Sequence, residues 1–187
     1  MAIYLAARDL SGVPVGTHQF LIINKLSTPY ISARLGDQVI KPRDLGNGSL
    51  GYVVGAQNRG NLSVEYFEKN DYQAALEFYD KSRISFFQSD FDTEVKQVKF
   101  QNINEAVATR KILNLIDIYH INQTMDRIKY PLAGIGINSN SWAQTLIDVV
   151  GGRVAGDMSG FDISNKKRIP KVYFSPVCLD RPRPLVN

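Results

Sequence analysis

Short, mostly apolar runs separated by turn residues fill the first third of the chain, which is typical of strands joined by turns. The pattern predicts strands over residues 3–7, 17–23 and 50–55. The run 28–35 alternates between hydrophobic and polar residues and is expected to pair with the strand at 17–23. Gly36-Asp37 and Asn47-Gly48 are signals for tight turns between such strands.

Helical periodicity dominates the middle of the chain. It predicts helices over 71–79, 104–119 and 142–150, with Asn70 as the cap of the first and Gly151-Gly152 ending the third. The helix at 104–119 is apolar around most of its circumference and is expected to lie deep in the core. Strands are predicted at 93–100 and 171–174. The fold class that follows is α+β, with a small antiparallel sheet or partial barrel packed against two or three helices.

The length of 187 residues fits one domain, which we place at 1–175, followed by an extended, proline-rich tail at 176–187. Hydrophobic residues make up 44% of the chain, enough for a core of ordinary size. A single cysteine, Cys178, excludes an intramolecular disulfide and is expected to be a small packing residue. The N-terminal residues resemble neither a secretory signal nor a membrane span, so we expect a cytoplasmic protein, or one exported without a cleavable signal peptide.

The net charge of +4 is concentrated near the C-terminus. Residues 162–183 include six basic residues and two acidic ones, Asp162 and Asp180, so this segment carries the whole excess of positive charge. The six are Lys166, Lys167, Arg168, Lys171, Arg181 and Arg183. This basic segment is either a solvated face or a surface for a protein partner. Aromatic residues do not alternate with these charges, which argues against nucleic acid as the partner.

The residue types exclude several kinds of chemistry. Two distant histidines, His18 and His120, and one cysteine offer no metal-ligand spacing, and no phosphate-binding or dinucleotide-binding glycine motif is present. We therefore expect neither a metal nor another cofactor. His120 lies at the polar end of the helix predicted at 104–119, where an imidazole caps the helix C-terminus favourably.

Two segments remain as candidates for catalysis. His18 opens a very apolar strand, where the sheet can hold its imidazole rigid as a general base, although a structural histidine is the alternative. Asn138-Ser139-Asn140-Ser141 precedes the helix at 142–150, and at least one of these residues is expected to cap it. A nucleophile at that helix N-terminus would sit at the positive end of the dipole, beside backbone N–H groups that stabilise an oxyanion.

The order of these segments resembles the circularly permuted NlpC-type branch of the papain-like hydrolases. In that branch a histidine strand precedes a nucleophile helix whose motif reads Asn-Cys-x-x-aromatic. The matching residues are Asn138, Ser139 and Trp142 for the motif, Gly16-Thr17-His18 for the strand, and Tyr130-Pro131-Leu132 for the lead-in. The resemblance extends in element order from Gly16 to Gly152.

The resemblance implies an acyl or amide hydrolase in which Ser139 is the nucleophile and His18 the general base. Substrates would be peptidoglycan peptides, isopeptides or lipid acyl bonds, and the biological setting a bacterial effector or toxin. Asn138 and Asn140 would lie at the oxyanion site. The family's third polar residue, which orients the histidine, has three candidates that follow His18: Gln38, Asn24 and Ser32.

One departure from the family keeps a second function open. The family's nucleophile is normally a cysteine, and a serine hydroxyl ionises far less readily than a thiol. Ser139 could still attack if His18 takes its proton during the reaction. The alternative is a catalytically inactive papain-like protein with a binding or structural role, in which the basic segment 162–183 is the partner surface.

Overall fold

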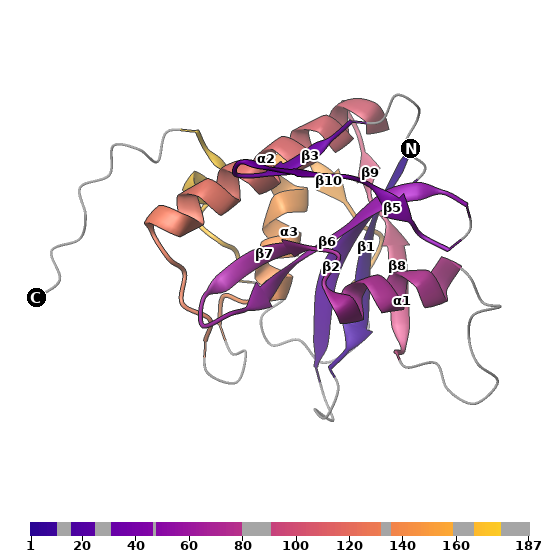
Figure 1. Ribbon diagram of the computed structural model, residues 1–187, viewed down its shortest axis with the longest axis horizontal. Coiled ribbons are helices and arrows are strands. Elements are labelled where there is room, and N and C mark those ends of the chain that lie inside the picture. Colours follow the sequence, from indigo (N-terminus) through magenta and orange to yellow (C-terminus); the bar gives the residue numbers. More distant parts are fainter. Residues whose placement is uncertain are drawn as a thin grey trace, which may run out of the picture.

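The computed structural model describes residues 1–10, 16–24, 31–46, 48–79, 91–131, 136–158 and 167–176. Its centre is a six-stranded antiparallel sheet with the strand order β5-β6-β2-β1-β8, in which β7 also pairs with β6 (Figure 1). The strands of this sheet are β1 (Ala2–Asp9), β2 (Thr17–Asn24), β5 (Arg43–Asp44), β6 (Leu50–Asn58), β7 (Leu62–Tyr66) and β8 (Thr93–Gln97).

Helices cover both faces of this sheet. Because the sheet is antiparallel and most of its strands precede the helices along the chain, the protein is α+β, as the sequence predicts. In Figure 1, α1 lies in front of the sheet and α3 lies behind it, while α2 crosses the top. The helices are α1 (Lys69–Tyr79), α2 (Glu105–Met125) and α3 (Ser139–Val150), and a 3-10 helix spans Lys171–Phe174. Two small two-stranded sheets join β3 (Ala33–Leu35) to β4 (Gln38–Ile40) and β9 (Lys99–Phe100) to β10 (Gly152–Arg153).

The core lies where the central strands meet the helices. Residues 20–23 of β2 are fully buried, because this strand is flanked by β1 and β6 and covered by helices on both faces. From β6, α2 and α3 come the three largest fully buried side chains, Tyr52, Tyr119 and Trp142. Each such side chain stabilises the fold by roughly 1.5–3 kcal/mol through removal of apolar surface from water.

The three predicted helices are confirmed, but α2 differs from its prediction in two respects. It continues to Met125, because no residue after position 119 breaks the helix, so His120 lies inside α2 and does not cap its end. The helix is also not buried all round: Arg110, Lys111 and Asn114 are exposed on one side. The imidazole of His120 instead packs beside the turn at Gly36.

Three strand predictions change in the structure. The run 28–35 does not pair with β2 in its described part; β3 pairs only with β4, since β1 and β6 already occupy both edges of β2. The run 93–100 divides at Val98 into β8 and β9. The strand predicted at 171–174 is a 3-10 helix that follows Pro170, where the fixed proline backbone starts a tight turn.

Several sequence predictions lie outside the described residues. They concern Asn47, Cys178, Lys166, Arg181 and Arg183, and all of the proline-rich tail except its first residue, Pro176. The buried apolar side chains of the described residues form one continuous core. Within the same residues, no helix is long and apolar enough to cross a membrane.

Tyr52 connects the β3–β4 hairpin to the main sheet, and we expect the protein's stability to depend on the hydrogen bonds of its hydroxyl. Its buried hydroxyl accepts a hydrogen bond from Ala33 N at 3.1 Å, and its single hydrogen is shared between Ile31 O at 2.9 Å and Ile40 O at 3.2 Å. Tyr52→Phe should therefore lower the free energy of unfolding by about 1–3 kcal/mol, because polar backbone groups lose their partner. Urea denaturation measures the change.

Tyr66→Phe is the matched control for that experiment. The Tyr66 hydroxyl is also buried but has no hydrogen-bond partner, and burial raises its pKa. Its removal should leave stability unchanged or slightly increased, since an unsatisfied polar group is lost. Equal losses in the two variants would contradict the assignment of Tyr52 as the connection.

Candidate functional site

The candidate site lies where β2 and β6 separate. Their pairing runs from Ile23 to Phe20, which lies opposite Gly55, and beyond that point β6 pairs only with β7. The N-terminus of α3 takes the free edge of β2: Asn140 Oδ1 accepts from Gln19 N at 2.7 Å, and Asn140 Nδ2 donates to Thr17 O at 2.9 Å. One side-chain amide thus supplies both hydrogen bonds that a neighbouring strand would otherwise make on either side of His18.

The imidazole of His18 points toward α1, on the opposite face of β2 from the side chain of Gln19, which hydrogen-bonds to Gln144 of α3. His18 Nε2 lies 3.1 Å from Asp71 Oδ2. Gln57 Nε2 donates to the same oxygen at 2.7 Å. The arrangement therefore joins residues from β2, β6 and α1 in one hydrogen-bonded group.

Arg8 of β1 completes this group from the other side. Its Nε donates to Asp71 Oδ1 at 2.8 Å, so each oxygen of the carboxylate has at least one donor. We call Arg8, His18, Gln57 and Asp71 the buried polar cluster; their exposed fractions are 5, 4, 9 and 0%. A buried carboxylate is tolerated only when it is paired and hydrogen-bonded in this way.

The charge state of Asp71 determines which atom of His18 can accept a proton. Burial of the carboxyl by itself raises the pKa of Asp71, but the charges and hydrogen bonds of His18 and Arg8 outweigh burial and lower the pKa below its usual range. Two groups lie 3.1 Å from His18 Nε2: Asp71 Oδ2, which can only accept a hydrogen bond, and the Gln57 amide, which can only donate one. Since the Gln57 amide already donates to Asp71 Oδ2 at the shorter distance of 2.7 Å, we assign the proton to His18 Nε2, which donates it to Asp71. This assignment follows from the hydrogen-bond network. It leaves Nδ1 of neutral His18 with a free lone pair.

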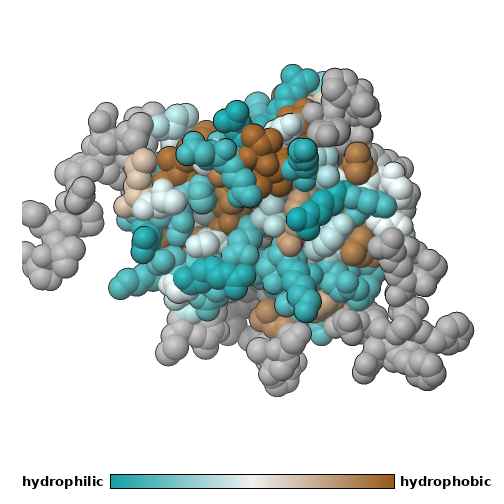
Figure 2. Space-filling view, in the orientation of Figure 1, coloured by the Kyte–Doolittle hydropathy of each residue, from teal (hydrophilic) through white to brown (hydrophobic). Residues whose placement is uncertain are grey.

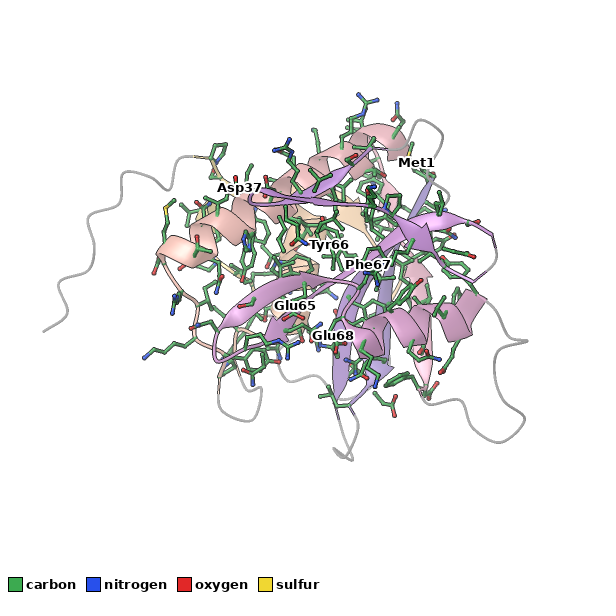
Figure 3. The ribbon with its side chains drawn as sticks, viewed as in Figure 1. Met1, Asp37, Glu65, Tyr66, Phe67 and Glu68 are labelled. Atoms are coloured by element: carbon green, nitrogen blue, oxygen red, sulfur yellow. The ribbon has the colours of Figure 1, made fainter. Side chains whose placement is uncertain are left out.

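The chain places Asp71 through an unusual turn between β7 and α1. Phe67 has a φ of 56°, the left-handed conformation that non-glycine residues seldom adopt, and Glu68 follows it. Figure 3 shows both residues between β7 and the start of α1. Glu68 Oε2 accepts hydrogen bonds from the backbone N–H groups of Asn70 at 2.8 Å and Asp71 at 3.2 Å. Glu68, and not the predicted Asn70, therefore caps α1.

Two further features bring α1 against the sheet beside Asp71. Glu68 Oε2 lies 3.8 Å from Arg8 Nη2, which ties the cap of α1 to the buried polar cluster. A side chain at Gly55 would bring a Cβ atom to 2.8 Å from Asp71 Oδ2, too close for any real contact. The glycine therefore provides the space in which α1 approaches β6.

The predicted capping of α3 is confirmed. Asn138 is the N-cap: its Oδ1 accepts from the N–H groups of Asn140 at 3.0 Å and Ser141 at 3.1 Å, and its own N–H donates to Ser141 Oγ at 3.3 Å. The N–H of Asn140 is thus occupied by the cap and not free for an oxyanion. Asn138 caps the helix and Asn140 joins it to β2, while the Ser139 hydroxyl donates to Asn140 Oδ1 at 3.3 Å.

The structure brings His18 and Ser139 to the same corner of the fold but does not join them by a hydrogen bond. Asn140, the neighbour of Ser139, contacts the backbone on both sides of His18. The Nε2 atom of His18 is directed to Asp71, and the Ser139 hydroxyl to Asn140. Both residues are almost fully buried, at 4% and 3% exposure.

None of the three candidates for the orienting residue contacts His18. Gln38 is exposed on the β3–β4 hairpin, whose turn at Asp37 lies far from Glu68 in Figure 3. Asn24 is at the opposite end of β2, and Ser32 is exposed before β3. The position beside His18 is taken by Asp71 and Gln57. The sequence signal for Asp71 is its spacing from Ala74 and Ala75, which places a carboxylate on the apolar face of α1.

Metal binding has no support in the part of the chain that the structure describes. No group of three histidine, cysteine, aspartate or glutamate side chains there could hold an ion. One polar atom of the site remains unsatisfied: the buried hydroxyl of Thr17, next to His18, has no hydrogen-bond partner. A buried hydroxyl of this kind normally forms a hydrogen bond, so we expect a water molecule or a ligand to bind there.

The lowered pKa of Asp71 predicts how stability depends on pH. Its unfolded pKa is about 3.9 and its folded pKa is lower, so its stabilisation is complete above pH 4 to 5 and is lost as the pH falls through the folded pKa. Asp71→Asn should lower the free energy of unfolding at pH 7 by about 3 kcal/mol or more. Between about pH 5 and 2, the free energy of unfolding should fall less steeply in this variant than in the wild type. Denaturation curves at several pH values test both effects.

Asp37→Asn serves as the control, because Asp37 is an exposed carboxylate in the turn between β3 and β4. It should change stability at neutral pH by no more than about 0.5 kcal/mol. An Asp71→Asn variant that matched this control at pH 7 would contradict the importance of the buried carboxylate.

Comparison of the chain with protein-family models, with curated proteins and with solved structures found no match. The resemblance to papain-like hydrolases therefore stays a prediction from two short motifs. The buried polar cluster and the N-terminus of α3 are the features of the structure that bear on its function.

Proposed function

We propose that the protein is an acyl or amide hydrolase in which Ser139 is the nucleophile, His18 the general base and Asp71 the residue that orients His18. The observation that carries the proposal is the hydrogen bond of 3.1 Å between His18 Nε2 and Asp71 Oδ2, beside the N-terminus of α3. A carboxylate, an imidazole and a hydroxyl in that order are the components of serine hydrolase chemistry.

His18 has the properties of a general base in this arrangement. Asp71 fixes the tautomer with the proton on Nε2, so Nδ1 can accept a proton from a nucleophile. The same carboxylate stabilises the imidazolium that forms when the proton arrives. Gln57 limits rotation of the carboxylate by its hydrogen bond of 2.7 Å, so the base is held in place before substrate binds.

Ser139 stands at the first position of α3, where the helix dipole favours developing negative charge. The cap at Asn138 occupies the N–H groups of Asn140 and Ser141, which leaves the N–H of Ser139 as the remaining backbone donor of this turn. That donor would serve the oxyanion. The unsatisfied hydroxyl of Thr17 offers a second polar group on the same corner.

Catalysis requires one rearrangement. The Ser139 hydroxyl has to leave Asn140 Oδ1 and come within hydrogen-bond distance of His18 Nδ1. Asn140 would keep its hydrogen bonds to Thr17 and Gln19 during this rearrangement, so the contact between α3 and β2 persists. Catalytic hydrogen bonds often tighten only when substrate is bound.

The binding or structural role remains the second candidate, and burial favours it. None of the described cavities is lined by His18 or Ser139, and both side chains are almost fully buried. In this case the cluster is a structural device, and partners would meet the basic segment 162–183. Of its described residues, Arg168 pairs with Asp148 at 2.6 Å, while Lys167 and Lys171 are exposed.

A thiol introduced at position 139 distinguishes the two candidates without knowledge of the substrate. Alkylation of Ser139→Cys by iodoacetamide, followed by mass spectrometry as the pH is raised, gives the pKa of this thiol. An imidazolium close by would hold that pKa at least about one unit below the ordinary value near 8.5. The native Cys178 is read from its own peptide in the same samples.

The matched variant is Ser139→Cys combined with His18→Ala. The hydrolase proposal predicts that removing the imidazole raises the thiol pKa by about one unit or more, whereas His120→Ala leaves it unchanged. A thiol pKa that is the same with and without His18 would show that the two residues do not act together. The binding role would then be the better account of the site.

A further inference from the structure

A groove between the β3–β4 hairpin and α2 lies apart from the buried polar cluster. It has a volume of about 240 Å³ and is lined by Ile31, Ser32, Arg34, Arg110, Leu113, Asn114 and Asp117. Drug-sized ligands occupy pockets of roughly 300–1,000 Å³, so this groove suits a small ligand or one group of a larger ligand. Nothing in the proposed hydrolysis uses these residues.

The two walls of the groove are held together by identified contacts. Asp117 Oδ1 accepts a hydrogen bond of 2.7 Å from Gly36 N in the hairpin turn, and His120 packs beside the same glycine. At the other end of β3, the Tyr52 hydroxyl binds Ala33 N. The hairpin is therefore fixed against α2 at one end and against the main sheet at the other.

The charges of the groove are not balanced. Arg34 comes from β3 and Arg110 from α2, and neither forms an ion pair with a carboxylate of the described residues. The single carboxylate that lines the groove, Asp117, is directed to the hairpin turn by its hydrogen bond to Gly36. Two arginines from opposite walls thus line the groove together with a single carboxylate, whose Oδ1 is engaged by the hairpin turn.

We propose that this groove binds a phosphate group, with Arg34 and Arg110 as the two principal ligands. Each guanidinium presents a planar fork of N–H donors that matches a pair of oxygens. A tetrahedral phosphate offers oxygens to both walls at once, whereas the two oxygens of a carboxylate lie in one plane and suit one fork. The Ser32 hydroxyl and the Asn114 amide add donors along the same groove.

The ligand is a phosphorylated small molecule or inorganic phosphate itself, and binding can be followed by NMR. The ¹⁵N-labelled protein is titrated at about 0.15 M salt with inorganic phosphate, glycerol 3-phosphate or acetate in separate arms. Saturable shifts of the Gly36, Asn114 and Asp117 amide signals are expected for the phosphate compounds. Tighter binding of glycerol 3-phosphate than of phosphate would assign the site to a phosphomonoester.

Variants of the two arginines test their roles. Arg34→Gln and Arg110→Gln should each weaken binding roughly tenfold or more, as expected for loss of a charge-assisted hydrogen bond. Arg110→Lys keeps the charge but loses the fork, and should also weaken binding. Lys111→Gln removes an equal charge from the neighbouring exposed position of α2 and should change affinity less than twofold.

Three results would overturn the proposal. They are the absence of saturable shifts with either phosphate compound, equal affinity for acetate and phosphate, and equal weakening by Lys111→Gln and Arg110→Gln. The last result would show a general effect of positive charge and not a site. Because Arg34, Arg110 and Lys111 are exposed, their variants should fold, and the wild-type amide spectrum outside the groove verifies this.

Discussion

The carboxylate of Asp71 is the constraint on which the rest of the structure depends. It is fully buried, yet it receives donors from β1, β2 and β6 through Arg8, His18 and Gln57. A buried charge without these partners would be strongly destabilising, so α1 can dock only where all three strands present their donors together. The turn at Phe67, the cap at Glu68 and the small Gly55 are local consequences of that requirement.

The same carboxylate connects stability with the proposed chemistry. Holding His18 by Nε2 makes Nδ1 available for a proton and also satisfies a buried charge. Along the free edge of β2, Asn140 replaces the missing strand and brings Ser139 to the same corner. The face of the protein shown in Figure 2 is largely hydrophilic, with hydrophobic residues gathered in the upper middle of the view. The groove at Arg34 and Arg110 is a separate feature with its own anchoring.

Sequence periodicity predicted the α+β class, the three helices and most of the central strands, because burial leaves a local pattern in each of them. It could not predict pairing: the partner of β2 at positions 52–55 is far away in sequence, and the nearer run 28–35 was a plausible but incorrect choice. Ser139 and His18 were chosen as candidates from their local sequence context. Asp71 was missed because its contact with His18 spans 53 positions and its own surroundings indicate only a helix.

The most direct test of the central claim is the tautomer of His18, measured by ¹⁵N–¹H correlation spectra of the two histidines near neutral pH. We expect neutral His18 to carry its proton on Nε2, with that proton slow to exchange and the state lost in Asp71→Asn, while His120 is unaffected. A neutral His18 protonated on Nδ1, or one unchanged by Asp71→Asn, would contradict the account. The carboxylate would then contribute to stability without preparing a general base.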